Sequence, residues 1–284
     1  MVTFFACLKG RAIMEDITER EFNGLVGFVK QTYGINLLQK KTLVCGRLSN
    51  YIVQSGFHSF SEYFAHVKSD RTGQAGVILV NKLTTNHTYF LREPQHFELL
   101  EKVILPHFAT SEAKGKDLRV WSAGCSTGEE PYTLAMVINA YFGPAKYGWN
   151  TKILATDIST AVLEQAQKAV YLSAQLEKLP DHWQRQYFHK IDAESSVLKD
   201  IIRQEVIFRR FNLMNETFPF KKKFHLIFCR NVMIYFDAET KMKLINQFYH
   251  HMEPGGYLFI GHSESINRHE SNYQFVAPAV YRKV

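Results

Sequence analysis

The chain has 284 residues, a length that allows one large domain or a small domain followed by a medium one. Hydrophobic residues make up 46% of it, enough for a substantial core, yet no run approaches the roughly 18 uninterrupted apolar residues of a membrane span. We therefore expect no membrane insertion. The net charge of +7 permits an acidic partner, either nucleic acid or an acidic protein surface.

The cysteines and the first residues bear on the cellular compartment. Four cysteines (Cys7, Cys45, Cys125 and Cys229) form no C-x-x-C pair, which predicts a reducing cytoplasm with no disulfide and no zinc site. Residues 1–14 have a short apolar run before their basic residues, the wrong order for a signal peptide. We expect residues 1–14 to form a loose leader and the protein to be cytoplasmic.

Residues 15–84 have the spacing of a small helical domain. Thr18 and Glu21 form a capping box that opens the first helix, and Gly34 ends it. Further helices are predicted over 39–54, from 59 or 61 to 67, and over 74–83. Residues 22–61 contain no Asp or Glu but include Lys40, Lys41 and Arg47. This basic group is either a docking face for an acidic partner or a solvated helical face.

Residues 85–116 form a junction and a helix. Residues 83–93 are dense in polar and aromatic side chains and lack the Gly, Ser and Pro of a linker. Such a junction is expected over the mouth of an α/β site, where ligands bind. Pro94 can start the following helix, predicted over 95–107.

Residues 117–142 predict the start of a nucleotide-binding α/β sheet. A short buried strand over 118–121 leads into a loop of small residues, 122–128, and a helix begins at Glu129. No Lys follows Gly128, so the loop is not a P-loop. Glu129 and Glu130 would repel phosphates but suit a ligand with hydroxyls, an amine or a sulfonium. The alternative is that both acids are only helix-start residues, which suit the helix dipole.

A second strand over 152–157 ends in Asp157. An acid at the tip of strand two typically binds a ribose diol, although the spacing from the first loop exceeds the roughly 20 residues of the dinucleotide fingerprint. Asp157 could instead be the N-cap of a helix over 160–168.

The remaining chain continues the alternation of strands and helices. Residues 171–204 read as an irregular insertion with a helix over 180–188 and a hairpin. Strands are predicted over 205–211, 223–231, 257–261 and within 273–281, and Asp237 caps a helix that runs to Met252. This alternation implies a parallel sheet with right-handed crossovers over 117–284.

Five stretches, taken together and in order, resemble the chemotaxis receptor methyltransferases of the CheR type. They are residues 85–93 (TNHTYFLRE), 121–132 (WSAGCSTGEEPY), 155–158 (ATDI), 227–236 (IFCRNVMIYF) and 255–265 (GGYLFIGHSES). The resemblance extends from about Ile17 to Tyr281.

The resemblance implies an α/β fold: a class I, Rossmann-like S-adenosylmethionine (SAM) methyltransferase sheet with an N-terminal all-helical domain and a small β-subdomain inserted near 175–205. It implies methyl transfer from SAM to glutamate side chains in the cytoplasmic methylation region of chemoreceptors, with S-adenosylhomocysteine as product, in chemotactic adaptation. It implies no metal and no nucleic-acid partner, and we expect a monomer. The cofactor residues it implies are Asn86, Thr88, Arg92, Glu130, Asp157, Asn212, Leu213, Arg230 and Asn231.

The chemistry agrees with this resemblance. The carboxyl of glutamate has an ordinary pKa of about 4.3, so the nucleophile is already ionised at pH 7 and needs no general base. The enzyme must align carboxylate, methyl and sulfur. Arg92 could pair with the incoming carboxylate, and Tyr235 would lie near the transferred methyl. The alternatives are a structural cap for Arg92 and core packing for Tyr235.

Two other functions remain open on the sequence alone. One is a nucleic-acid methyltransferase, although residues 230–235 replace the [DNS]-P-P-[YFW] stretch that amino-methylating enzymes carry after strand four. The other is a non-catalytic SAM-binding scaffold, which the presence of both Arg92 and Tyr235 disfavours.

Overall fold

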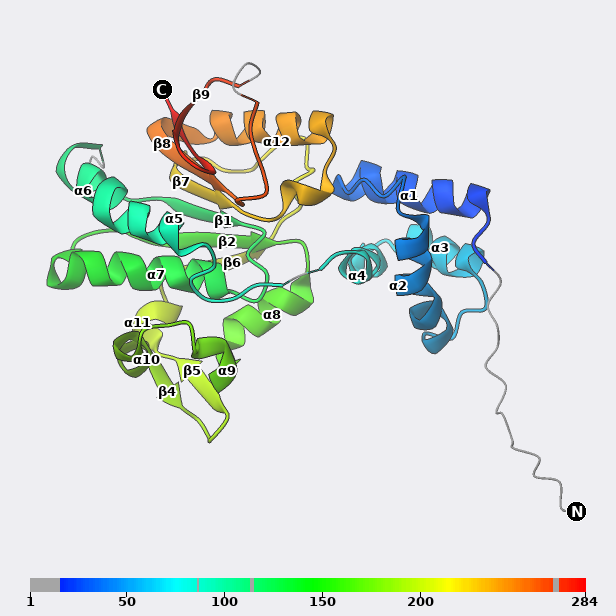
Figure 1. The fold of residues 1–284 in the computed structure, drawn as a ribbon, viewed down its shortest axis with the longest axis horizontal. Coiled ribbons are helices and arrows are strands. Elements are labelled where there is room, and N and C mark those ends of the chain that lie inside the picture. Colours follow the sequence, from blue (N-terminus) through cyan, green and yellow to red (C-terminus); the bar gives the residue numbers. More distant parts are fainter. Residues whose placement is uncertain (1–15, 86, 113–114, 268–270) are drawn as a thin grey trace, which may run out of the picture. The chain divides into compact units, whose positions relative to one another are not determined.

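The computed structural model describes residues 16–85, 87–112, 115–267 and 271–284 (Figure 1). The chain divides into two compact units, Met1–Thr85 and Asn86–Val284. The predicted leader, 1–14, lies outside the described residues. Among the described cysteines, Cys45, Cys125 and Cys229 have free thiols. Within the described ranges, no helix is both long enough and apolar enough to cross a membrane.

The described part of the first unit, residues 16–85, contains four helices: α1 (Glu19–Tyr33), α2 (Lys41–Gln54), α3 (Phe60–Ser69) and α4 (Gln74–Leu83). Both halves of the capping box at Thr18 and Glu21 are present, and Gly34 ends α1 in the left-handed conformation with φ of 75°. The helices bury one apolar face each, and the fully buried side chains include Leu25, Val26, Val29, Val44, Leu48, Ile52 and Leu79.

The second unit is built on a seven-stranded sheet with the order β6-β2-β1-β7-β8-β10-β9. Strands β1 (Val120–Ala123), β2 (Ile153–Asp157), β6 (Val206–Arg210), β7 (Phe224–Cys229) and β8 (Met252–Ile260) are parallel, whereas β9 (Tyr273–Ala277) and β10 (Val280–Lys283) add antiparallel pairs. The prediction of a parallel sheet is therefore wrong at this end, because β9 and β10 are joined by a tight turn too short for a crossover.

Two faces of this sheet are covered by different side chains. On β1, Val120 joins a cluster with Leu134 of α7 (Glu129–Phe142), while its neighbour Trp121 packs against Phe248 of α12 (Ala238–His250), with ring centroids 5.3 Å apart. Successive residues of a strand point to opposite faces, so α7 and α12 lie on opposite sides of β1. Asp237 caps α12, as predicted: its side chain accepts a hydrogen bond from Thr240 N.

The helix predicted over 95–107 is longer and less regular than expected. It runs as α5 (Pro94–Leu99), the π-helical segment η1 (Leu100–Ile104), α6 (Leu105–His107) and a second π-helical segment η2 (Phe108–Glu112). Pro106 lies inside it and has no N–H to donate. Widened turns accommodate such a residue in a continuing helix.

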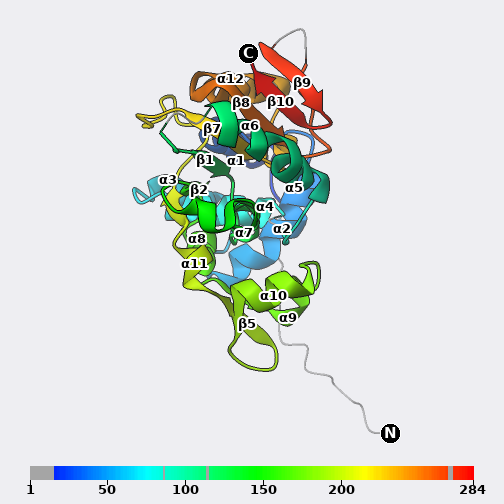
Figure 2. The ribbon, with the colours of Figure 1, turned by 90° about the vertical axis from the view of Figure 1, so that its left-hand side faces the viewer.

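The inserted subdomain forms its own sheet, with the order β3-β5-β4. It comprises β3 (Val170–Leu172), α9 (Ser173–Leu176), α10 (Asp181–Tyr187), β4 (Phe188–Lys190), β5 (Ser195–Leu198) and α11 (Asp200–Arg203), so it begins before the predicted residue 175. Figures 1 and 2 show it beyond α7 and α8 (Thr160–Lys168), away from the end of the main sheet that carries β9.

The loop after β1 depends on glycine. Gly124 has φ of 86°, and a Cβ there would lie 2.5 Å from Cγ2 of Val232. Gly148, in the turn after η3 (Gly143–Lys146), has a similar φ of 89° but open space around it. The two glycines therefore separate the cost of the backbone conformation from the cost of the clash.

We expect Gly148→Ala to lower the free energy of unfolding by about 1–2 kcal/mol, the cost of a left-handed residue with a Cβ. Gly124→Ala should lose that amount and about 1–3 kcal/mol more from overpacking. Urea unfolding followed by tryptophan fluorescence measures both, because Trp121, Trp149 and Trp183 all lie in the second unit. Equal losses in the two variants would show that Val232 moves aside and that the clash at Gly124 costs no free energy.

Candidate active site

The loop after β1 is tied to the tip of β2. The main-chain N–H groups of Gly124 and Cys125 donate to the Thr156 carbonyl over 2.8 and 2.9 Å. Ser126 N donates to Oδ2 of Asp157 over 2.9 Å. These bonds hold the small-residue loop and the acid of β2 together at the carboxyl edge of the sheet, where open α/β folds bind ligands.

Asp157 does not cap α8. The N-cap of that helix is Ser159, whose side chain accepts from Val162 N, and Oδ1 of Asp157 accepts from Ser159 N over 3.0 Å. The alternative N-cap role is therefore wrong. Burial raises the pKa of the Asp157 carboxyl, although the N–H groups of Ser159 and Ser126 oppose that shift.

Glu129 and Glu130 begin α7 but are not exposed helix-start residues. Glu129 is 1% exposed and accepts from the Thr127 hydroxyl over 2.7 Å. Glu130 accepts from the Ser122 hydroxyl over 2.7 Å. Burial raises the pKa of both carboxyls, so a helix-start role alone does not account for their placement.

Cys125 lies among these acids. Its thiol is buried, and burial, together with the charges of Asp157 and Glu130, raises its pKa. Asp157 accepts from Ser126 N, and Glu130 accepts from the Ser122 hydroxyl, so the acid of β2 and the acid of α7 both contact residues 122–126, the stretch that contains Gly124. Both sequence-predicted acids thus lie against the end of β1 and the loop after it.

Arg230 is a buried brace at the end of β7. Its Nη1 donates to Glu130 over 3.1 Å, and its Nη2 donates to Glu93 over 2.9 Å and to the Arg92 carbonyl. Its side chain is 2% exposed. The guanidinium is occupied by these partners, so it joins α7 to the segment before α5.

The segment before α5 has a strained backbone on both sides of Arg92. Leu91 and Glu93, on either side of it, have φ of 55° and 56°, values that residues with a Cβ rarely adopt. Nη1 of Arg92 donates to the His87 carbonyl over 2.6 Å, and its guanidinium lies 5.8 Å from the centre of the Tyr89 ring. Residues held this way cluster at functional sites.

The other residues implied for the site lie in the segment before α5 or shortly after β6 and β7. Thr88 is half-buried in the segment before α5, and Asn212 and Leu213 follow β6. Asn231 follows β7 with φ of 59°, and half-buried Tyr235 ends a short 3₁₀ helix, η4 (Met233–Tyr235). Asn86 lies outside the described residues.

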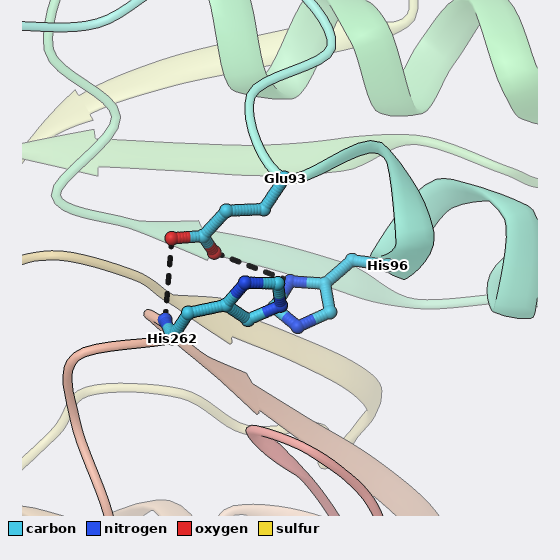
Figure 3. A group of neighbouring side chains, drawn as sticks. All are labelled: Glu93, His96 and His262. Atoms are coloured by element: carbon cyan, nitrogen blue, oxygen red, sulfur yellow. Dashed lines mark hydrogen bonds and ion pairs between the residues drawn. The ribbon is translucent and has the colours of Figure 1, made fainter.

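Three groups in the site were missed by the sequence analysis. Glu264 is 6% exposed and accepts from Gly261 N and Asn231 N over 2.6 and 3.1 Å. Glu93 pairs with Arg230, and His96 lies against Glu93 (Figure 3). Glu93 and Glu264 both lie inside stretches that carry the resemblance, 85–93 and 255–265. The presence of an acid in such a stretch could have marked both as site residues.

The basic residues of the first unit are not equivalent. Nζ of Lys41 lies 2.5 Å from Oε1 of Glu19, which lowers the local charge. Nη2 of Arg47 donates to the Thr85 hydroxyl over 2.8 Å. Lys40, the exposed N-cap residue of α2, lies seven residues before Arg47, so the two share a helix face.

The open sheet, the glycine-bearing loop after β1 and the acids at the start of α7 and the tip of β2 are the features of a class I SAM-dependent methyltransferase. Comparison with known proteins agrees. Residues 86–281 match the CheR methyltransferase SAM-binding domain, and residues 20–84 match the CheR methyltransferase all-alpha domain. The chain belongs to the CheR methyltransferase family.

Named relatives cover nearly all of the chain. A chemotaxis protein methyltransferase of Borreliella burgdorferi is 42% identical over 272 residues, 94% of this chain and 95% of that protein. Chemotaxis protein methyltransferase 1 of Pseudomonas aeruginosa is 36% identical over 88% of this chain and 91% of its own length. The Escherichia coli chemotaxis protein methyltransferase is 33% identical over 93% and 91%.

We expect Arg230→Met to lower the free energy of unfolding by about 3–5 kcal/mol, because it leaves two buried carboxylates without their cation. Arg203→Met is the control: Arg203 pairs with exposed Asp200 over 3.3 Å, and its loss should cost at most about 1 kcal/mol. Urea unfolding followed by tryptophan fluorescence compares them. Equal losses would contradict the bracing role of Arg230.

Proposed function

We propose that this enzyme transfers the methyl group of SAM to glutamate carboxylates in the cytoplasmic methylation region of chemoreceptors, giving glutamate methyl esters and S-adenosylhomocysteine. The observation that carries the proposal is that Glu130 accepts from the Ser122 hydroxyl and Asp157 accepts from Ser126 N, on either side of Gly124. Two carboxylates there favour a cationic, hydroxyl-bearing ligand over a phosphate. The relatives' names supply the chemotactic context, and this substrate would place the enzyme in the cytoplasm.

The cofactor would be held by groups from several strand ends. Asp157 is suited to the ribose diol, because its carboxylate can accept two hydroxyl donors. Glu130 is suited to the amino end of SAM. Thr88, Asn86, Asn212, Leu213 and Asn231 would complete the pocket. The Arg230 side chain is already occupied, so we assign it to orienting Glu130, with any cofactor contact made by its main chain.

The transfer itself needs alignment rather than proton transfer. A glutamate carboxylate is ionised at pH 7, and SAM carries the methyl on a sulfonium when bound. Arg92 would pair with the incoming carboxylate and offset its loss of water. Tyr235, near the same edge of the sheet, would position the carboxylate or the methyl. The bent backbone at Leu91 and Glu93 would hold Arg92 in place.

SAM and S-adenosylhomocysteine should raise the thermal stability of the protein, by about 2.7 kcal/mol at 100 times the dissociation constant. Asp157→Asn should weaken binding of both. Because burial raises the pKa of Asp157 in the free enzyme and ribose hydroxyls favour its ionised form, affinity is full above that raised pKa and lost as pH falls through it. Calorimetric titration across pH measures this, and an unchanged pH profile in Asp157→Asn would remove Asp157 from the ribose site.

Arg92→Ala and Tyr235→Phe should lower turnover more than they weaken SAM binding. Loss of one charge-assisted contact costs about 1.5–3 kcal/mol, or roughly ten- to hundredfold in rate. Tritiated SAM with receptor cytoplasmic fragments gives the rate, and label that base releases as methanol reports an ester. A variant with wild-type turnover would lose its catalytic role, and base-stable label would contradict glutamate methylation.

We propose that Lys40, Lys41 and Arg47 dock the acidic methylation region of a receptor. Lys40→Glu and Arg47→Glu should raise the KM for receptor and make that KM less sensitive to salt. The affinity for SAM should stay unchanged. Lys41→Glu should have a smaller effect, because Glu19 already pairs with Lys41. Lys68→Glu, an exposed lysine of α3 whose Nζ lies over the Phe64 ring, is the control. Receptor kinetics equal to those of the control at low salt would make the group a solvated face.

A further inference from the structure

Glu93, His96 and His262 converge beside the methyltransferase site (Figure 3). Glu93 precedes α5, His96 lies within α5, and His262 follows β8. One ligand atom from each lies within 4.8 Å of the others, the only such group among the residues that the structure describes. The two imidazole rings meet edge to face, with centroids 4.7 Å apart.

His96 has unused ligand capacity. Its side chain is 2% exposed, and neither Nδ1 nor Nε2 has a hydrogen-bond partner of good geometry in the described part of the chain. The Pro278 carbonyl lies near the ring but outside good hydrogen-bond geometry. A buried polar atom without a partner costs free energy, so an ion bound at one of these nitrogens would remove part of that cost.

The ligand types of the group suit a transition-metal ion. Glu93 offers a carboxylate oxygen, and His96 and His262 each offer a ring nitrogen. A carboxylate and two imidazoles are ligands that Zn²⁺ binds well.

The distances also fit. Four ligands at about 2.0–2.1 Å from a tetrahedral Zn²⁺ lie roughly 3.3 Å apart. Nδ1 of His96 is already 3.6 Å from Oε2 of Glu93. His262 is exposed, so its ring can rotate to complete the set and an ion can enter from its side. Three protein ligands leave a fourth position for water.

We propose that Glu93, His96 and His262 form a Zn²⁺ site whose occupation opposes SAM binding. The ion is an inhibitor, separate from the methyl-transfer chemistry. Oε2 of Glu93 accepts from Arg230 over 2.9 Å, so ion and guanidinium compete for one oxygen. Arg230 also holds Glu130, and through it the ion disturbs the proposed cofactor pocket. The antagonism rests on the proposed function, whereas ion binding does not.

The direct test is calorimetric Zn²⁺ titration of the full-length, tag-free, chelator-treated protein, with Co²⁺ absorption as a second readout of coordination. One ion should bind per chain. His262→Asn and His96→Phe should each weaken binding by more than the roughly 10–100-fold that loss of an outer partner costs. The control, His189→Asn, changes an exposed histidine of β4 and should bind as the wild type does. Binding absent from the wild type, or equal in all four proteins, would overturn the site.

The second arm measures S-adenosylhomocysteine affinity with and without saturating Zn²⁺. Zinc should weaken the affinity in wild type and in His189→Asn but not in His262→Asn, and by reciprocity the product should weaken zinc binding by the same factor. Unchanged affinity in zinc-loaded wild type would overturn the antagonism. Failure of S-adenosylhomocysteine to bind even without zinc would instead contradict the proposed function, and the zinc titration alone would still decide the metal site.

Discussion

The buried pairing of Arg230 with Glu93 and Glu130 is the interaction on which the site depends. One guanidinium joins the end of β7 to the start of α7 and to the segment before α5. Removing charges from water is costly, and the fork of an arginine can satisfy two carboxylates at once. This brace fixes Glu130 beside the loop after β1, and it fixes the strained backbone that carries Arg92.

Much of the fold could be predicted from sequence because its signals are local. The capping box at Thr18, Gly34 at the end of α1 and Asp237 at the start of α12 act within one turn of chain. The antiparallel end of the sheet could not be predicted in the same way, because the pairing of β10 between β8 and β9 is a long-range choice. The π-helical turns around Pro106 were likewise hidden by an apolar spacing that suits a regular helix.

The site was predictable only in part, for a related reason. Asp157 and Glu130 stand at strand and helix ends, where position alone suggests a ligand. Glu93, His96 and Glu264 gain their importance from burial and from partners more than a hundred residues away or on another strand, which spacing does not reveal. Arg230 was predicted to contact the cofactor, but its side chain donates to Glu93 and Glu130. We therefore propose that the side chain holds these two acids in place.

We propose that this CheR-family enzyme makes methyl esters on receptor glutamates, and mass spectrometry of receptor cytoplasmic fragments after incubation with SAM is the decisive test. We expect one added methyl group on glutamates of the methylation region, present with the wild-type protein and absent without it. Methyl groups found only on other side chains, or on nucleic acid offered in the same mixture, would contradict it.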